Sequence, residues 1–190
     1  GGQTMNPSAA ELLEAVERVP ADQVVVLPNN SNIVAVARTL DGQSAKRVVV
    51  VPTTSVPEGF ASLLGYDPES DAASNAESMA EIAKGVVVGE VTRAVRASTT
   101  SVGEVATGDW VGLDRIGICS IADAPSTAAT ALLDTLVDRD HEILTVIVGE
   151  GVRDVETRAI TEWIAENRPN IETEIHQGGQ GHYPYLFGVE

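Results

Sequence analysis

The sequence predicts an α/β fold with a mixed, largely parallel sheet flanked by helices. Short apolar runs rich in β-branched residues, at Gln23–Leu27, Lys46–Val51 and Ile143–Val148, are typical of buried strands. Each run is followed by a small or polar turn and then by apolar residues at helical spacing, which is the order of a βα unit. The apolar period changes to two over Val86–Ala97, and this indicates antiparallel strands in the same sheet.

The first twenty residues predict a lead-in followed by one helix. Ser8 and Glu11 have the spacing of a capping box, and Pro20 ends the apolar pattern that follows. We treat residues 1–20 as this lead-in and helix, and residues 21–190 as a single α/β domain, because no linker divides the chain. Since the chain opens with Gly1 rather than Met, we expect it to be a piece of something longer.

Polar side chains follow the first two predicted strands at the points where they end. The carboxyl ends of neighbouring parallel strands meet at one edge of a sheet, where open α/β sheets usually bind ligands. We therefore expect a polar shelf for a partner or a ligand, formed by Asn29, Asn30, Ser31, Asn32, Thr53, Thr54 and Ser55. The helix after the second turn is expected to bury Phe60, Leu63 and Leu64.

The middle of the chain predicts a polar helix over Asp71–Lys84 and then the alternating strand. Four polar residues of the alternating stretch are expected to border the shelf, and they are Glu90, Thr92, Arg93 and Arg96. For Arg93 the alternative is a place near a sheet edge with a carboxylate partner. Thr99–Thr107 is interpreted as a flexible connection, and a hairpin is expected around Asp114.

The last third predicts two helices and two extended runs around the strand Ile143–Val148. The helix before Pro169 is expected to turn Val155 inward, together with Ile160, Trp163 and Ile164. The tail contains Tyr183, Tyr185 and Phe187, and Pro184 favours an edge strand that offers these aromatic rings for docking. The alternative is that the tail packs back and completes the sheet.

Composition and motifs exclude several classes of function. A net charge of −16 disfavours nucleic acid and anionic lipid as partners. No apolar run has the length of a membrane span, and a lone Cys119 fits a reducing compartment such as the cytoplasm. No phosphate-binding glycine loop and no nucleophile with its base is evident. The three histidines lack neighbours at ligand spacing. We therefore assign no catalytic, cofactor-binding or metal-ligating residue.

Several stretches, in order along the whole chain, resemble one family. This family is the C-terminal part of the bacterial fatty acid kinase A subunit, of the YloV-like, DhaL-domain-containing, dihydroxyacetone kinase-like type. The matching stretches are Gly1–Ser8, Leu27–Ile33, Val50–Gly59, Glu90–Arg96, Gly108–Trp110 and Gly178–Leu186. The resemblance implies a fold similar to the N-terminal half of the DegV-like fatty acid-binding partner.

The same resemblance implies a non-catalytic role in a cytoplasmic kinase of lipid metabolism. The domain would dock the DegV-like partner, whose bound fatty acid is phosphorylated by an N-terminal DhaL-like kinase domain that this chain does not contain. ATP and Mg²⁺ are implied for that missing domain, and no cofactor for this one. Two alternatives stay open. One is a DegV-like domain that binds a lipid or small molecule or acts as an enzyme, and the other is a dimerisation module that forms a homodimer.

Overall fold

The computed structural model describes residues 6–190, so the start of the predicted lead-in, residues 1–5, lies outside the described residues. By its internal contacts the chain divides into two compact units, Gly1–Val86 and Val87–Glu190. Each unit has hydrophobic clusters of its own. The treatment of residues 21–190 as one domain stays a prediction, and the first helix belongs to the core of the first unit.

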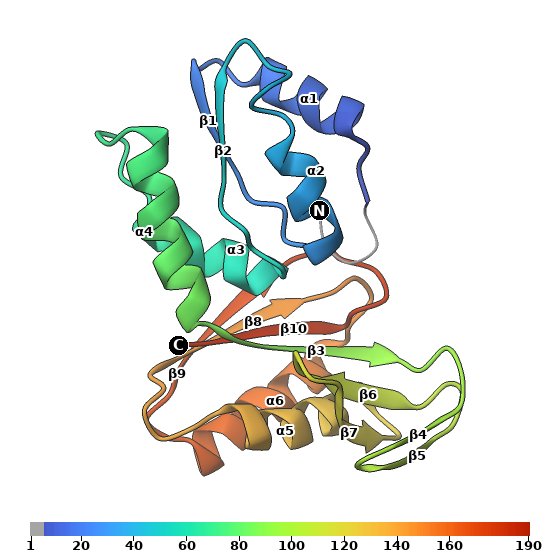
Figure 1. Cartoon of the computed structure of the whole chain (residues 1–190). Helices are drawn as coiled ribbons and strands as arrows, with labels where there is room; N and C mark the ends of the chain where they lie inside the picture. The colour runs from blue at the N-terminus through green and yellow to red at the C-terminus, as the bar shows by residue number, and fades with distance from the viewer. Residues whose placement is uncertain (1–5) are drawn as a thin grey trace. The chain divides into compact units, whose positions relative to one another are not determined.

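The first unit is a two-stranded parallel sheet with helices on both faces (Figure 1). Its elements are α1 (Ala9–Arg18), β1 (Gln23–Val26), α2 (Ser31–Arg38), β2 (Arg47–Val50), α3 (Val56–Ser62), the 3₁₀ turn η1 (Leu63–Gly65) and α4 (Ala72–Gly85). Two strands alone are marginally stable in water, so this sheet depends on the helices that cover it.

The two faces of this small sheet bury different helices. Val24 and Val48 are register partners, and they pack on one face against Val16 of α1. On the other face, Val51 packs against Met79 of α4. The predicted strands at Gln23–Leu27 and Lys46–Val51 are therefore confirmed. Because helices cover both faces of the sheet, side chains on both faces of each strand are apolar, which explains the continuous β-branched runs.

Local capping chemistry sets the helix starts of the first unit. Ser8 and Glu11 form the predicted capping box of α1. The side chains of Asn30, Ser55 and Asp71 each accept a backbone N–H in the first turn of α2, α3 and α4. These side chains satisfy helix N–H groups that have no partner within their own helix.

The second unit is a six-stranded sheet with α5 and α6 packed on one face (Figure 1). The strands follow the order β7-β6-β3-β10-β8-β9. The elements are β3 (Val87–Arg93), β6 (Trp110–Leu113), β7 (Ile118–Ala122), α5 (Pro125–Leu136), β8 (Ile143–Val148), α6 (Asp154–Asn167), β9 (Glu172–Gln177) and β10 (Tyr185–Val189). A separate hairpin pairs β4 (Ser98–Thr100) with β5 (Gly103–Val105).

The mixed α/β class is confirmed, but the sheet is not largely parallel. In the six-stranded sheet only β8 and β9 run parallel, and the other pairings are antiparallel. Two of these pairings are made by β10, the C-terminal strand, which lies between β3 and β8 and runs antiparallel to both, and the other two join β3, β6 and β7. A βα pattern along the sequence fixes neither the neighbour of a strand nor its direction.

The interpretation of the tail as an edge strand is wrong, and the alternative holds. Tyr185 and Phe187 have no exposed surface, and they lie on the face of β10 that packs against α5 and α6. Their rings stack with centroids 5.9 Å apart. Pro184 precedes β10 and therefore does not interrupt its pairing. The tail is a core strand of the second unit, and Tyr185 and Phe187 cannot serve as an exposed docking edge.

Three smaller expectations are also wrong. Thr99–Thr107, interpreted as a flexible connection, contains the hairpin of β4 and β5. Val155 is 59% exposed rather than inward, because it lies in the first turn of α6 ahead of the buried Ile160. Phe60, Leu63 and Leu64 are exposed rather than buried, by 38%, 52% and 74%. The hairpin around Asp114, in contrast, is confirmed.

Candidate functional site

Two hydrogen bonds between Asn29 and Thr53 join the ends of β1 and β2. The backbone N–H of Asn29 donates to Oγ1 of Thr53 at 3.1 Å, and the Thr53 hydroxyl donates to Oδ1 of Asn29 at 2.8 Å. Thr53 is fully buried. Because β1 and β2 are parallel neighbours, their turns lie at the same edge. The structure thus brings the two predicted strand-end turns together.

Asn29 is held in an unusual backbone conformation against Gly59 of α3. Its φ is 55°, in the left-handed region that asparagine tolerates better than most residues. A Cβ atom built on Gly59 would lie 2.0 Å from Oδ1 of Asn29. Only glycine leaves room for this side chain, so α3 and the first turn pack directly on one another.

Asn30 is buried and begins α2. Its Oδ1 accepts the backbone N–H of Asn32 at 2.9 Å, and its Nδ2 donates to Oδ1 of Asn6 at 3.4 Å. Ser31 and Asn32 follow on the surface. The turn therefore has a buried structural residue next to two exposed polar residues.

The second turn contains a carboxylate that sequence reasoning missed. Glu58 is only 4% exposed, and it accepts hydrogen bonds from both the backbone N–H and the hydroxyl of Thr54. Oγ of Ser55 accepts the Glu58 N–H at 3.3 Å. The Ser55 to Glu58 spacing is that of a capping box, and this signal was available in the sequence.

These residues together form the strand-end shelf, which consists of Asn29–Asn32, Thr53–Ser55 and Glu58. Its frame is buried and internally hydrogen-bonded, and its exposed members are Ser31, Asn32 and Thr54. Amide and hydroxyl groups donate and accept hydrogen bonds without a formal charge. Such a surface suits recognition of a polar group. That it binds a partner or ligand stays a prediction.

The four predicted bordering residues belong to the second unit. Glu90 and Thr92 share one face of β3, and Oγ1 of Thr92 donates to the carbonyl of His182 at 2.8 Å. Arg93 points to the opposite face, and its guanidinium lies 4.8 Å from the centroid of the Trp110 ring. The exposed Arg96 follows β3. That these residues border the shelf of the first unit stays a prediction.

The protein environment perturbs the titration of Glu90. Burial raises the pKa of its carboxyl above the ordinary value of 4.5. Burial, and then the charge of Glu90, raise the pKa of the half-buried Tyr183. The Glu90 carboxylate therefore disfavours the ionised form of Tyr183.

The glycine turn before β10 is held in place by Gln180. Its Nε2 donates to the carbonyls of Ile147 and Tyr183, each at 3.1 Å. A Cβ atom on Gly149 would lie 2.3 Å from the Tyr183 carbonyl. This close approach explains the glycine at position 149, and the φ of 75° at Gly151 explains the second one.

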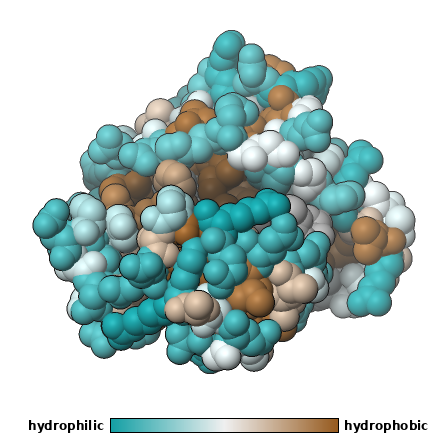
Figure 2. Space-filling model, turned by 90° about the horizontal axis from the view of Figure 1, so that it is seen from above, coloured by the Kyte–Doolittle hydropathy of each residue, from teal (hydrophilic) through white to brown (hydrophobic). Residues whose placement is uncertain are grey.

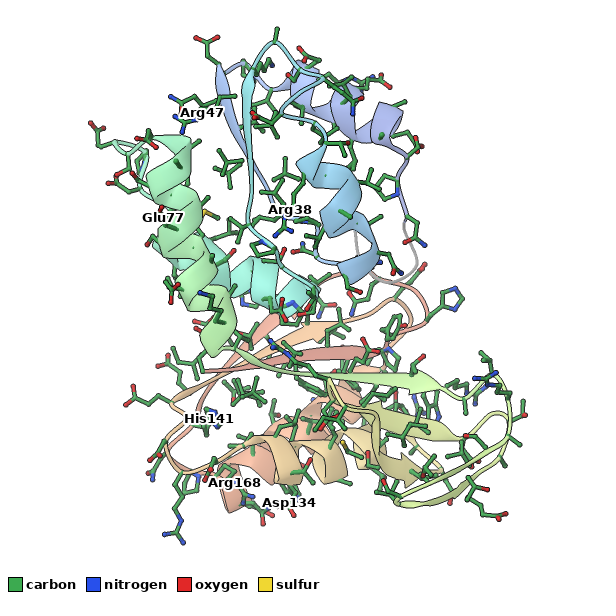
Figure 3. All side chains as sticks on the ribbon, viewed as in Figure 1. Arg38, Arg47, Glu77, Asp134, His141 and Arg168 are labelled. Atoms are coloured by element: carbon green, nitrogen blue, oxygen red, sulfur yellow. The ribbon has the colours of Figure 1, made fainter. Side chains whose placement is uncertain are left out.

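A pocket of about 570 Å³ in the second unit lies beyond the C-terminal ends of α5 and α6, where His141 and Arg168 line it. Arg168, which lies near Asp134 in Figure 3, donates to Oδ1 of that residue at 2.7 Å. Its guanidinium lies 5.6 Å from the centroid of the Trp163 ring. Basic side chains at helix C-termini complement the carbonyl ends. The strand-end shelf contributes no residue to this lining.

The face seen in Figure 2 is predominantly hydrophilic, with scattered apolar patches. Within residues 6–190, no helix combines the length and the apolar character that a membrane crossing requires. Over the same residues, no cluster of three or more His, Cys, Asp or Glu side chains is arranged to hold a metal ion.

Relatives of this sequence match over the whole chain. An uncharacterised protein of Staphylococcus haemolyticus is 39% identical over 194 residues, covering all of this chain and 34% of that protein. An uncharacterised protein of Staphylococcus aureus strain USA300 is 35% identical over 190 residues, covering all of this chain and 35% of that protein. The chain thus spans about a third of the length of the curated relatives that it matches.

The fold is similar to those of DegV-type proteins. The fatty acid kinase B3 protein of Streptococcus pneumoniae, solved loaded with linoleic acid, matches with a TM-score of 0.65 at 14% identity, over 97% of this chain and 76% of that one. A DegV family protein of Ruminococcus gnavus matches with a TM-score of 0.63 at 13% identity, over 97% and 77%. The dihydroxyacetone kinase of C. freundii also matches, with a TM-score of 0.63 at 14% identity, over 97% and 41%.

These similarities in fold agree with the DegV-like architecture expected from the sequence. At such identities they show the fold alone. The sequence model of the FakA-like C-terminal family, which describes the C-terminal part of fatty acid kinase A-like subunits, matches residues 1–190. The chain therefore belongs to the FakA-like C-terminal family.

Proposed function

We propose that this chain is a non-catalytic, cytoplasmic domain of a longer fatty acid kinase subunit. It docks a DegV-like fatty acid-binding protein, so that the bound fatty acid reaches a DhaL-like kinase domain elsewhere in the full protein. In this proposal ATP and Mg²⁺ are bound by that kinase domain.

The observation that carries the proposal is the match of the whole chain to a C-terminal family of kinase subunits. The chain covers about a third of its curated relatives, which leaves room in them for a separate kinase domain. The chemistry of the shelf is compatible with recognition. Thr53 is hydrogen-bonded to Asn29, and Thr54 is hydrogen-bonded to Glu58 although its residue is exposed. Asn32 is exposed as well.

The test is calorimetric titration of the full-length protein, and of this chain, with the fatty acid-loaded DegV-like protein of the same cell. Saturable binding to both supports docking by this domain. Asn32→Ala and Thr54→Ala are expected to weaken binding several-fold if the shelf takes part. Binding by the full-length protein but not by this chain would place recognition in the rest of the protein and contradict the proposal.

A second candidate is that this domain itself binds a fatty acid. The similarity in fold to a solved protein that was loaded with linoleic acid favours it. Titration of the domain with a free fatty acid, without the partner protein, separates the two functions. Saturable one-to-one binding would support the second candidate.

A further inference from the structure

α3 and η1 present their large apolar side chains to solvent and their small ones to the protein. The exposed side chains are Phe60, Leu63, Leu64 and Tyr66, at 38%, 52%, 74% and 54%. We call these four residues the α3 patch. The buried residues of the same helix are Pro57, Glu58, Gly59, Ala61 and Ser62. This is the reverse of the amphipathic pattern that a helix on the surface of a globular protein normally shows.

The orientation of α3 is fixed by contacts that a rotation would break. Glu58 accepts hydrogen bonds from Thr54, and Gly59 packs against the Asn29 side chain. These contacts hold the small residues inward. The apolar side chains therefore cannot be buried by a turn of the helix without loss of the frame of the strand-end shelf.

η1 is fixed in the same way against α4. A Cβ atom on Gly65 would lie 3.0 Å from Cδ1 of Ile82 and 3.1 Å from the Met79 nitrogen. This close approach leaves Leu63, Leu64 and Tyr66 on the outside of the turn. The patch is thus a rigid feature of the first unit rather than a frayed helix end.

Other exposed apolar side chains of the described chain are separated along the sequence. Val95 is 89% exposed, Ile116 is 96% exposed and Val155 is 59% exposed, and each stands in a different loop or helix start. Single exposed apolar residues are ordinary. Four within seven residues, on one fixed helix and its following turn, are typical of a protein interaction site.

The charges around the patch indicate the chemistry of the partner. The charged residues that adjoin the patch along the chain are acidic. Asp67 and Glu69 directly follow the patch and are exposed. With a net charge of −16, a second copy of the chain or an anionic membrane would be repelled. A surface that combines apolar side chains with Lys or Arg complements both features.

We propose that the α3 patch docks an apolar surface, rimmed by Lys or Arg, on the fatty acid-binding partner of the proposed function. This assignment rests on that function and names the face that carries it. The four apolar side chains supply the contact area. The acidic residues that follow them attract the basic rim of the partner and orient the partner on the patch.

The test is the affinity of variants of the full-length protein for the fatty acid-loaded partner. Leu64→Glu and Leu63→Glu each place a charge on the patch, and Ile116→Glu makes the same change at an exposed apolar site elsewhere. We expect both patch variants to raise Kd at least about tenfold and Ile116→Glu to leave it unchanged. Thermal melting of each variant checks folding, which these exposed positions should preserve.

The outcomes separate the two proposals. If the partner binds all three variants as tightly as it binds the wild type, docking holds but the α3 patch is not its site. If the partner does not bind the wild type, docking and this assignment both fail. A dimer of the full-length protein that Leu64→Glu dissociates, seen by sedimentation, would show that the patch pairs two copies and would overturn the assignment.

A charge variant tests the chemistry of the rim. Glu69→Lys removes an acidic side chain beside Tyr66 and should slow association with the partner several-fold at low salt. It should also reduce the dependence of the association rate on ionic strength, because part of this steering is electrostatic. An unchanged salt dependence, measured by stopped flow, would contradict a basic rim on the partner.

Discussion

Oδ1 of Asn29 occupies the space beside Gly59 in which any other residue would place its Cβ atom. The distance from Oδ1 to such an atom would be 2.0 Å, which is far inside van der Waals contact. The same oxygen accepts the Thr53 hydroxyl hydrogen bond. One atom therefore ties together the first turn, the second turn and α3, and each of the three can be tested separately.

Gly59→Ala is expected to destabilise the protein by about 1–3 kcal/mol, because the methyl group displaces the Asn29 side chain from a packed position. Gly85→Ala is the matched control, since a Cβ atom there would meet nothing within 4 Å. Urea unfolding of both variants measures the difference. Equal midpoints for Gly59→Ala and the wild type would show that Asn29 does not pack on Gly59.

Thr53→Val is expected to cost about 1–3 kcal/mol, because it leaves the Asn29 N–H without its buried acceptor. The backbone N–H of Asn29 should then exchange with deuterium at least about tenfold faster than in the wild type. Thr53→Ser keeps the hydroxyl and loses one methyl group, so its amide exchange should stay close to that of the wild type. Equal protection of Asn29 in Thr53→Val and Thr53→Ser would refute the hydrogen bond.

Phe187→Ala is expected to destabilise the second unit by about 3–5 kcal/mol, because it opens a cavity in a central strand. Ile116→Ala, at a side chain 96% exposed, should change stability by less than about 0.5 kcal/mol. Denaturant unfolding provides the comparison. A loss of stability in Phe187→Ala as small as that in Ile116→Ala would contradict the placement of β10 in the core of the sheet.

The raised pKa of Glu90 predicts how the stability of the protein changes with pH. Burial raises the pKa of its carboxyl in the folded state above 4.5, so the folded state binds more protons than the unfolded state just above that pH. The contribution of Glu90 to stability therefore falls as pH rises from 4.5 through the raised value.

Glu90→Gln removes this penalty. The variant should be more stable than the wild type at pH 7, and the difference should shrink as pH falls toward 4.5, because a growing fraction of the wild-type carboxyl is then protonated. Parallel urea titrations across this range measure the difference. A wild type that is more stable than Glu90→Gln at pH 7 would show that a compensating partner holds the ionised carboxylate.

The sequence by itself determined the elements whose signals are local. The helix starts at Ser8, Asn30, Ser55 and Asp71 follow from side chains that accept hydrogen bonds within three residues along the chain. The buried strands β1, β2 and β8 follow from runs of β-branched residues. Both signals are complete within a few residues, so no distant contact is needed to interpret them.

The tertiary structure alone decided which faces and edges are covered. Periodicity groups Phe60, Leu63 and Leu64 on one face of α3 and η1, but tertiary contacts, such as that of Gly59 with Asn29, leave that face exposed. In the same way, the aromatic pattern of β10 does not reveal that β3 and β8 flank it. Both outcomes depend on residues far apart in the sequence, whose meeting is set by packing of the whole unit.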